Sequence, residues 1–221
     1  MARLRSTIIK DILPGLLFLT LLGCKKDTEY IISGRLIDPN QSINIEGASV
    51  EVWVQRIMSG IFEADYKLAG EQKTGSNGSF QIKLESGNYT GVKMIFSKKG
   101  YFGWETQLNL ETLKNNNGLN AYYQMVPKTF LKIHVFNQVP LDASDYFDFR
   151  LLNAYTNCEE CCKGQDYEFS GMDVNQTLQC LSSGNTELIL QWTRRKNKEQ
   201  VVKTESIFTK AFDTTKIEFI Y

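Results

Sequence analysis

Short runs of alternating apolar and polar residues, bounded by turn residues, are the feature that most constrains the fold of this chain. Residues 80–84 alternate in this way, and residues 130–136 repeat the pattern in the second half of the chain. Such alternation places one face of a strand on a core and the other face in solvent, as in antiparallel sheets. Helical periodicity is nearly absent, so the sequence predicts an all-β protein built from antiparallel β-sandwiches.

A first β-sandwich is expected over residues 30–126. Its predicted strands cover residues 30–36, 48–57, 80–84, 92–96, 104–110 and 122–126. The dipeptide Asn77-Gly78 can supply the positive-φ positions of a tight hairpin turn. Residues 58–70 look like an insertion in the hairpin between the second and third strands, which is either a binding loop or one more edge strand.

Five short segments of this first module follow one another in an order that can be compared with a known domain family. They are GRLID at 34–38, GASVEV at 47–52, TGSNGSF at 74–80, GNY at 87–89 and KGY at 99–101. This order resembles the carboxypeptidase regulatory-like domain, a prealbumin-like seven-stranded sandwich common at the start of outer-membrane and surface proteins of Gram-negative bacteria. The resemblance implies an accessory sandwich without peptidase activity, because the chain has a single histidine, His134.

A second module is expected over residues 127–221. Its predicted strands cover residues 130–136, 146–152, 188–193, 201–208 and 216–221, with a hairpin turn at 196–199. Five or more strands over about 90 residues indicate an immunoglobulin-like sandwich. The basic residues around the turn indicate a soluble hairpin tip.

The first 24 residues resemble a bacterial lipoprotein signal peptide that ends in a lipobox. A basic start precedes the apolar residues 12–22, which are too few to cross a bilayer, and the sequence LLGC ends at Cys24. The resemblance implies that residues 1–23 are removed and that acyl chains on Cys24 anchor the protein. Residues 24–29 then form a polar tether, and we expect an outer-membrane lipoprotein at the cell surface or, alternatively, facing the periplasm.

The charge of the processed chain excludes a basic nucleic-acid footprint. Removal of residues 1–23 leaves 22 basic and 24 acidic side chains, a net charge of −2. We therefore predict no nucleic-acid partner.

The four other cysteines indicate two disulfides, because the chain carries an export signal. They are Cys158, Cys161, Cys162 and Cys180. A bond between neighbouring cysteines is strained, which leaves two pairings: Cys158–Cys161 with Cys162–Cys180, or Cys158–Cys162 with Cys161–Cys180. In either pairing one bond closes a loop of about twenty residues and stabilises the fold by about 3 kcal/mol. The alternatives, a zinc site with four thiolates and a redox-active pair, are disfavoured by the ligand spacing and by the absence of a βαβ pattern.

The remaining candidate residues each have a structural and a functional interpretation. His134 is expected on the outer face of its strand. Asp142, Asp145 and Asp148 resemble a loose calcium loop but lack its glycine and terminal glutamate, so a solvated loop is expected and calcium binding stays open. The aromatic residues Tyr101, Phe102 and Trp104 form either a ligand surface or part of the core.

These features lead to a main functional hypothesis and two alternatives. The main hypothesis is a non-enzymatic, membrane-anchored surface lipoprotein that acts as a binding or accessory module for a glycan or a protein. The first alternative is a structural or assembly protein of the envelope, or an adhesin component, and the second is a hydrolase with a minimal site. We predict no catalytic residue, cofactor or metal, and we expect the second module, with its cysteine loop of residues 158–180, to be the part farther from the membrane.

Overall fold

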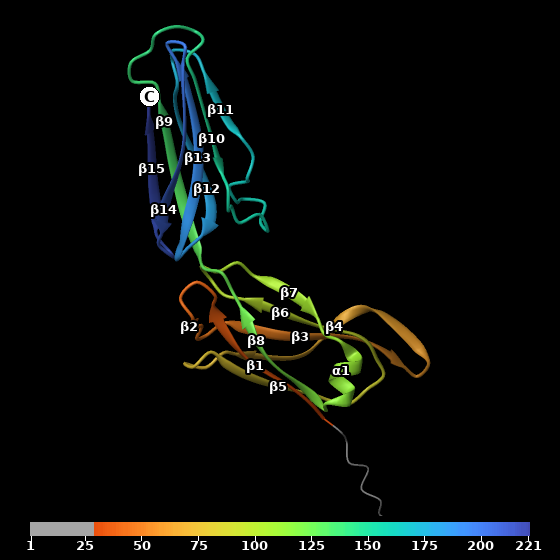
Figure 1. The fold of residues 1–221 in the computed structure, drawn as a ribbon. Helices are drawn as coiled ribbons and strands as arrows, with labels where there is room; N and C mark the ends of the chain where they lie inside the picture. The colour runs from red at the N-terminus through yellow and green to blue at the C-terminus, as the bar shows by residue number, and fades with distance from the viewer. Residues whose placement is uncertain (1–28) are drawn as a thin grey trace, which may run out of the picture.

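The computed structural model describes residues 29–221, which form two consecutive β-sandwiches built almost entirely from strands (Figure 1). The prediction of an all-β fold is confirmed. The expected signal peptide and Cys24 lie outside the described residues. No helix in residues 29–221 is long and apolar enough to cross a membrane.

Module one, which contains β1 to β8, consists of two sheets of four strands. In the first sheet, β1 pairs antiparallel with β2 and β5 and parallel with β8. The second sheet has the order β4-β3-β6-β7. The strands are β1 (Tyr30–Asp38), β2 (Ile43–Asn44), β3 (Ser49–Met58), β4 (Ile61–Lys73), β5 (Ser79–Leu84), β6 (Tyr89–Ser97), β7 (Trp104–Gln107) and β8 (Gly118–Gln124).

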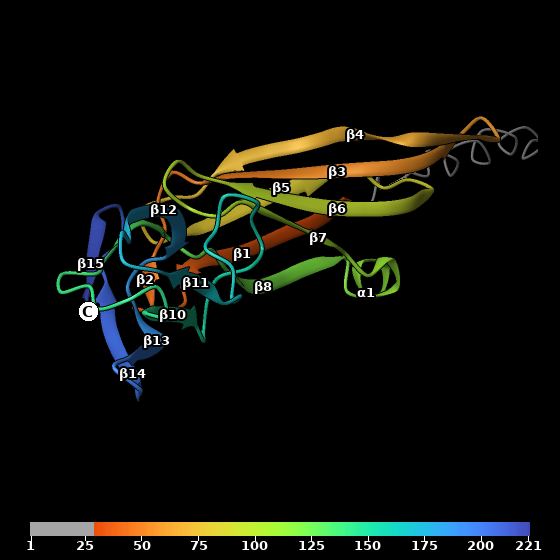
Figure 2. The same cartoon turned by 90° about the horizontal axis from the view of Figure 1, so that it is seen from above.

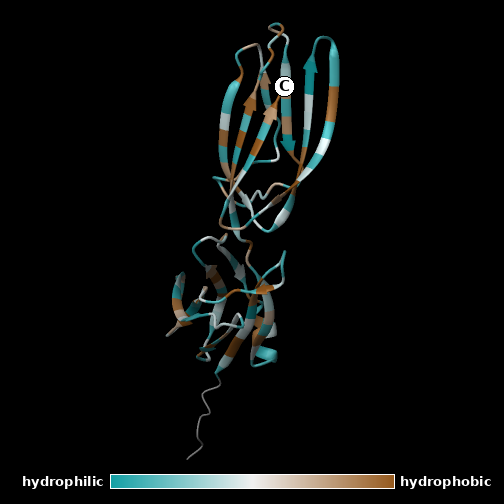
Figure 3. Cartoon of the chain, turned by 90° about the vertical axis from the view of Figure 1, so that its left-hand side faces the viewer, coloured by the Kyte–Doolittle hydropathy of each residue, from teal (hydrophilic) through white to brown (hydrophobic). Residues whose placement is uncertain are grey.

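The core of module one lies between these two sheets and follows the alternation of the sequence. Val50 and Val52 on β3 are fully buried, and Phe80 on β5 and Phe96 on β6 pack edge to face across the core. The polar residues between them point outward, so apolar and polar bands alternate along the strands (Figure 3). The period of two thus places this core, as the sequence predicted.

The segment of residues 58–70 is an edge strand rather than a loop. A two-residue turn at Ser59-Gly60, with φ of 51° and 80°, joins β3 to β4, and both positive values fit the tight turn of a hairpin. The long hairpin extends past the rest of its sheet (Figure 2). Asn77-Gly78 instead lies in the connection from β4 to β5, which belong to different sheets, so the hairpin turn expected there is wrong.

A short helix replaces the end of one predicted strand. β7 stops at Gln107, and α1 (Leu110–Asn115) follows. The Asn109 side chain accepts a hydrogen bond of 2.9 Å from the backbone N–H of Thr112, which is the usual N-cap contact. Leu113 then points into the core, where it is buried.

Gly34 lies where β1 is crowded by both of its long neighbours. A Cβ atom at this position would lie 2.4 Å from the carbonyl oxygen of Ala121 and 2.7 Å from the ring of Tyr123. We therefore expect Gly34→Ala to lower the free energy of unfolding by about 1–3 kcal/mol, the usual cost of overpacking. Gly75→Ala is the matched control, because its Cβ would meet nothing closer than 3.5 Å. Equal denaturation midpoints in urea for the two variants would contradict the prediction.

Module two, which contains β9 to β15, is a second sandwich of two sheets. One sheet has the order β11-β10-β13-β14 and the other β12-β9-β15. The last strand pairs parallel with the first in this module, as β8 does with β1 in module one. The strands are β9 (Lys128–Phe136), β10 (Tyr146–Leu151), β11 (Tyr167–Ser170), β12 (Asn175–Ser183), β13 (Thr186–Lys196), β14 (Glu199–Thr209) and β15 (Thr214–Ile220).

The predicted faces of module two are also confirmed. Phe147 and Phe149 on β10 are buried, and their rings pack against Phe219 on β15. The predicted hairpin turn joins β13 to β14, with positive φ at Asn197 and Lys198. Strands β11 and β12 and the short β2 were not predicted.

The directions of the strands show which parts of the chain lie at each end of the described structure. β1 begins at Tyr30, at the end of module one away from module two, and runs toward module two (Figure 1). β9 then leads from the junction to the opposite end of module two, where the chain also ends after β15. We call this end, with residues 137–145 and the β13–β14 turn, the distal end.

Candidate functional site

The joint between the modules is formed by hydrogen bonds and by a small buried apolar cluster. β8 ends at Gln124 and β9 begins at Lys128, so only three residues link them. The backbone N–H of Phe102 donates to the carbonyl of Val126 at 2.9 Å, and that of Lys128 donates to Gly100 at 2.7 Å. The link is therefore hydrogen-bonded on both sides of Pro127 to the loop after β6.

Polar side chains close a second part of the joint. Asn40, after β1, donates through Nδ2 to the carbonyl of Gly184 in module two at 3.0 Å. Asn185 donates back to the buried carboxylate of Asp38 at 2.9 Å. These reciprocal contacts fix the turn between β12 and β13 against the end of β1.

An aromatic cluster fills the middle of the joint. Phe102 of module one is only 4% exposed, and its ring stacks on Tyr155 of module two with centroids 4.1 Å apart. Burial raises the pKa of the Tyr155 hydroxyl. Cys161 and Leu181 complete the same buried cluster. The joint therefore contains an apolar contact as well as hydrogen bonds.

The three aromatic residues considered as a ligand surface lie in these contacts rather than on an exposed platform. Phe102 is in the joint, and Tyr101 packs against Phe212 of module two with centroids 5.2 Å apart. Trp104 stacks on Phe96 at the edge of the core of module one, 4.8 Å between centroids. The core interpretation of these residues therefore describes them better than the ligand interpretation.

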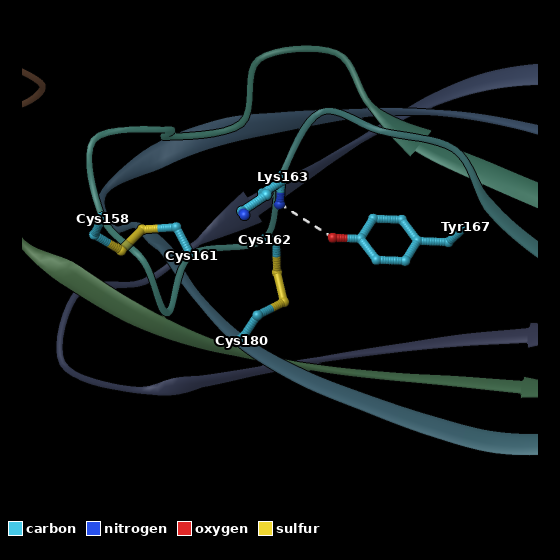
Figure 4. The surroundings of a disulfide bond; sticks show 6 residues. All are labelled: Cys158, Cys161, Cys162, Lys163, Tyr167 and Cys180. Carbon is cyan, nitrogen blue, oxygen red and sulfur yellow. Dashed lines mark hydrogen bonds between the residues drawn. A yellow bond between two sulfur atoms is a disulfide. The ribbon is translucent and has the colours of Figure 1, made fainter.

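The cysteines form two disulfides, Cys158–Cys161 and Cys162–Cys180, which is one of the two predicted pairings (Figure 4). The second bond ties the loop after β10 to β12. Backbone hydrogen bonds of 2.9–3.0 Å between this loop and Leu181 run beside it. The loop is thus held at two adjacent points.

The first part of the cysteine loop lies at the joint, an end of module two that the sequence did not indicate. β9 leads away from the joint and β10 returns toward it, so the segment that follows β10 is at the joint. Cys158 and Cys161 belong to the cluster that surrounds Phe102. The disulfides therefore support the contact between modules, not a distal binding loop.

The distal end contains a buried polar cluster of Asn137, Asp145 and Lys196. The Asp145 carboxylate accepts hydrogen bonds of 2.9 Å from Asn137 Nδ2 and from the backbone N–H of Leu141. Burial alone would raise the pKa of Asp145, but these hydrogen bonds and the ammonium of Lys196 outweigh it and hold the pKa below its usual range. Lys196 in turn donates to Asn137 Oδ1 at 2.7 Å.

The calcium interpretation of the same loop does not fit this arrangement. Asp145 faces Asn137 and Lys196, whereas Asp142 accepts its hydrogen bonds from Ser144, and Asp148 lies on β10. Among residues 29–221, no group of three acidic, histidine or cysteine side chains is arranged to hold a metal ion. His134 is on the outer face of β9, where its Nε2 lies 2.8 Å from Asn175 Oδ1.

The outer surface of the distal end is a shallow polar hollow. The guanidinium of Arg195 stacks over the ring of Tyr146 at 3.9 Å, and Ser144, Lys198 and Gln200 line the rest. A separate apolar strip lies at the tip of the β3–β4 hairpin. There Ile57, Met58, Ile61 and Phe62 are exposed.

The sequence did not identify the residues that complete the joint and the distal polar cluster. Tyr155 and Asn137 carry no sequence signal, because each is defined by a neighbour far away in the chain. Lys196 was seen only as one of the basic residues of a hairpin tip, although its side chain is 11% exposed. Asn137 follows the end of β9 and contacts the buried Asp145. This contact could have been found only once the pairing of β9 was known.

No protein-family model and no curated protein matches the sequence, so the resemblance to the carboxypeptidase regulatory-like domain stays a prediction. Among solved structures, the chain is similar to the Bacillus anthracis TIE protein, with 10% identity and a TM-score of 0.33, over 87% of this chain and 33% of that chain. It is also similar to the shaft pilin SpaA from Lactobacillus rhamnosus GG, with 7% identity and a TM-score of 0.29 over 87% and 97% of the two chains. The major pilin subunit BcpA of Bacillus cereus shares 14% identity at a TM-score of 0.32, over 80% of this chain and 67% of that chain. This chain thus spans about a third of the TIE protein, and likeness of this degree says nothing about function.

Proposed function

We propose that this protein is a non-enzymatic, lipid-anchored structural component of the cell envelope, of an adhesin-like kind, that holds its second module away from the membrane. The observation that carries the proposal is the ordered joint. Its three-residue link, its reciprocal hydrogen bonds and the buried Phe102–Tyr155 stack restrict bending between the modules. A spacer needs this stiffness, whereas a flexible tether would have a longer, polar linker.

The order of the elements supports the same function. The predicted anchor at Cys24 precedes Tyr30, where β1 enters module one at the end away from the joint. Module two then continues from the opposite end of module one. The start of β1, which follows the proposed anchor in the chain, and the distal surface are thereby at opposite ends of the described residues.

A role as a module that binds a protein is the second candidate, and one observation favours it. Apolar side chains of the β3–β4 hairpin tip are exposed next to one another, and such strips occur at protein contacts. Glycan binding has less support, because Tyr101 and Phe102 contact module two instead of forming a platform.

The anchor is tested by Cys24→Ser in the full chain. We expect complete loss of palmitate labelling and transfer of the protein from the membrane fraction to the soluble fraction, because the acyl chains provide the attachment. Thr28→Ser, in the same tether, is the matched control and should keep both labelling and membrane association. Unchanged labelling of Cys24→Ser would overturn the proposed anchor.

The side of the membrane is tested on intact cells. A protease added outside should degrade the protein if it is on the surface, and permeabilisation should be unnecessary. Protection until the outer membrane is opened would assign the spacer to the periplasm.

A further inference from the structure

The amine of Lys196 and the side-chain amide of Asn137 meet in a buried site at the distal end. Lys196 Nζ lies 2.7 Å from Asn137 Oδ1, and Asn137 is only 3% exposed. Lysine is rarely buried, because its charge is costly to remove from water. A lysine amine held against a carboxamide is a nucleophile beside an acyl group.

Asp145 is placed to move the protons that this pair would exchange. Its Oδ2 accepts a hydrogen bond of 2.9 Å from Asn137 Nδ2 and lies 3.7 Å from Lys196 Nζ. Its other oxygen, Oδ1, is buried and has no hydrogen-bond partner among the described residues. One carboxylate therefore faces both the attacking nitrogen and the nitrogen that would leave.

We propose that Lys196 and Asn137 become joined by an intramolecular amide bond. The Asp145 carboxylate takes a proton from the Lys196 ammonium, and the neutral amine attacks Cγ of Asn137. The bond from Cγ to Nδ2 then breaks, and the leaving nitrogen collects protons from Asp145 and from the attacking nitrogen. The ammonium side chain and the carboxamide thus give a secondary amide and one ammonium ion, with no oxidant or reductant.

The surroundings hold the two groups in contact. The Asn137 backbone N–H donates to the carbonyl of Val174 at 2.9 Å, and its Nδ2 also reaches the carbonyl of Gly171 at 3.2 Å. The ring of Tyr221 lies 5.3 Å from Lys196 Nζ. Fixed orientation of two reactants strongly accelerates a reaction between them.

The bond would join the two sheets of module two. Asn137 directly follows β9 in one sheet, and Lys196 is the last residue of β13 in the other. The Cys162–Cys180 disulfide supports the same module near the joint. The proposed amide would therefore fasten the distal end of a module whose other end is already cross-linked.

The test is a peptide map of the purified full chain, reduced and then cut after glutamate. We expect a branched peptide that joins residues 112–159 to residues 188–199. Its mass should be lower than the sum of the two linear peptides by one molecule of ammonia. Lys196→Arg keeps the charge but should give only linear peptides, whereas Lys198→Arg, in the same hairpin turn, should still give the branched one.

Complete recovery of the two linear peptides from the folded wild-type protein would overturn the proposal. This result does not depend on any variant, so a folding defect in Lys196→Arg leaves the test intact. Asp145→Asn is expected to abolish the branched peptide. A folded Asp145→Asn protein that forms it as completely as the wild type would overturn the role assigned to the carboxylate.

Discussion

Replacing Phe102 with alanine is expected to lower the free energy of unfolding by about 3 kcal/mol, the lower end of the usual cost of removing a buried phenylalanine ring. The ring is 4% exposed and stacks on Tyr155 across the joint. Its loss leaves a cavity between modules that only three linking residues connect. We therefore expect the angle between the modules to vary more widely in solution.

Phe62→Ala is the matched control, because this phenylalanine is 56% exposed and lies at the tip of the β3–β4 hairpin, away from the joint (Figure 2). Urea denaturation measures the stability of both variants, and small-angle X-ray scattering measures the spread of molecular length. The Phe102 variant should unfold at lower urea and show a broader distribution of lengths. Two variants with the same midpoint and the same scattering would show that the stack neither stabilises nor stiffens the joint.

Much of each sandwich could be predicted because alternation is a local property of the chain. Every second residue of β5, β9 and β15 enters a core, and the sequence alone shows this period. The sequence left both a loop and an edge strand open for β4, because its apolar residues are exposed and it buries no face that would create the pattern. α1 was missed because six residues are too few to display a helical period.

The contacts between modules could not be predicted because they depend on topology. Phe102 follows Gly100-Tyr101, and nothing local indicates whether its ring enters the core, contacts solvent or meets another module. The sequence also did not show at which end of module two the cysteine loop lies, because sequence order alone gives no strand direction. The loop lies at the joint because β10 returns toward the joint, and this direction is set by the pairing of β10 with β13.

The two disulfides should differ in their contribution to stability. Cys162–Cys180 closes a loop of 18 residues, whereas Cys158–Cys161 closes one of only 3. Because a longer loop loses more freedom in the unfolded chain, Cys162→Ala with Cys180→Ala should lower the free energy of unfolding by about 3 kcal/mol, and the other pair by about 1.5 kcal/mol.

The shorter disulfide is expected to act on the joint instead. Cys158 and Cys161 pack in the cluster around Phe102, so Cys158→Ala with Cys161→Ala should broaden the distribution of lengths in scattering more than the other double variant does. Stability and stiffness would then be separable, each assigned to one disulfide. Urea denaturation measures the stability of each double variant, and scattering on the same samples measures its bending. Equal losses of stability would contradict this division of roles, and so would a Cys162 and Cys180 double variant that bends more than the other.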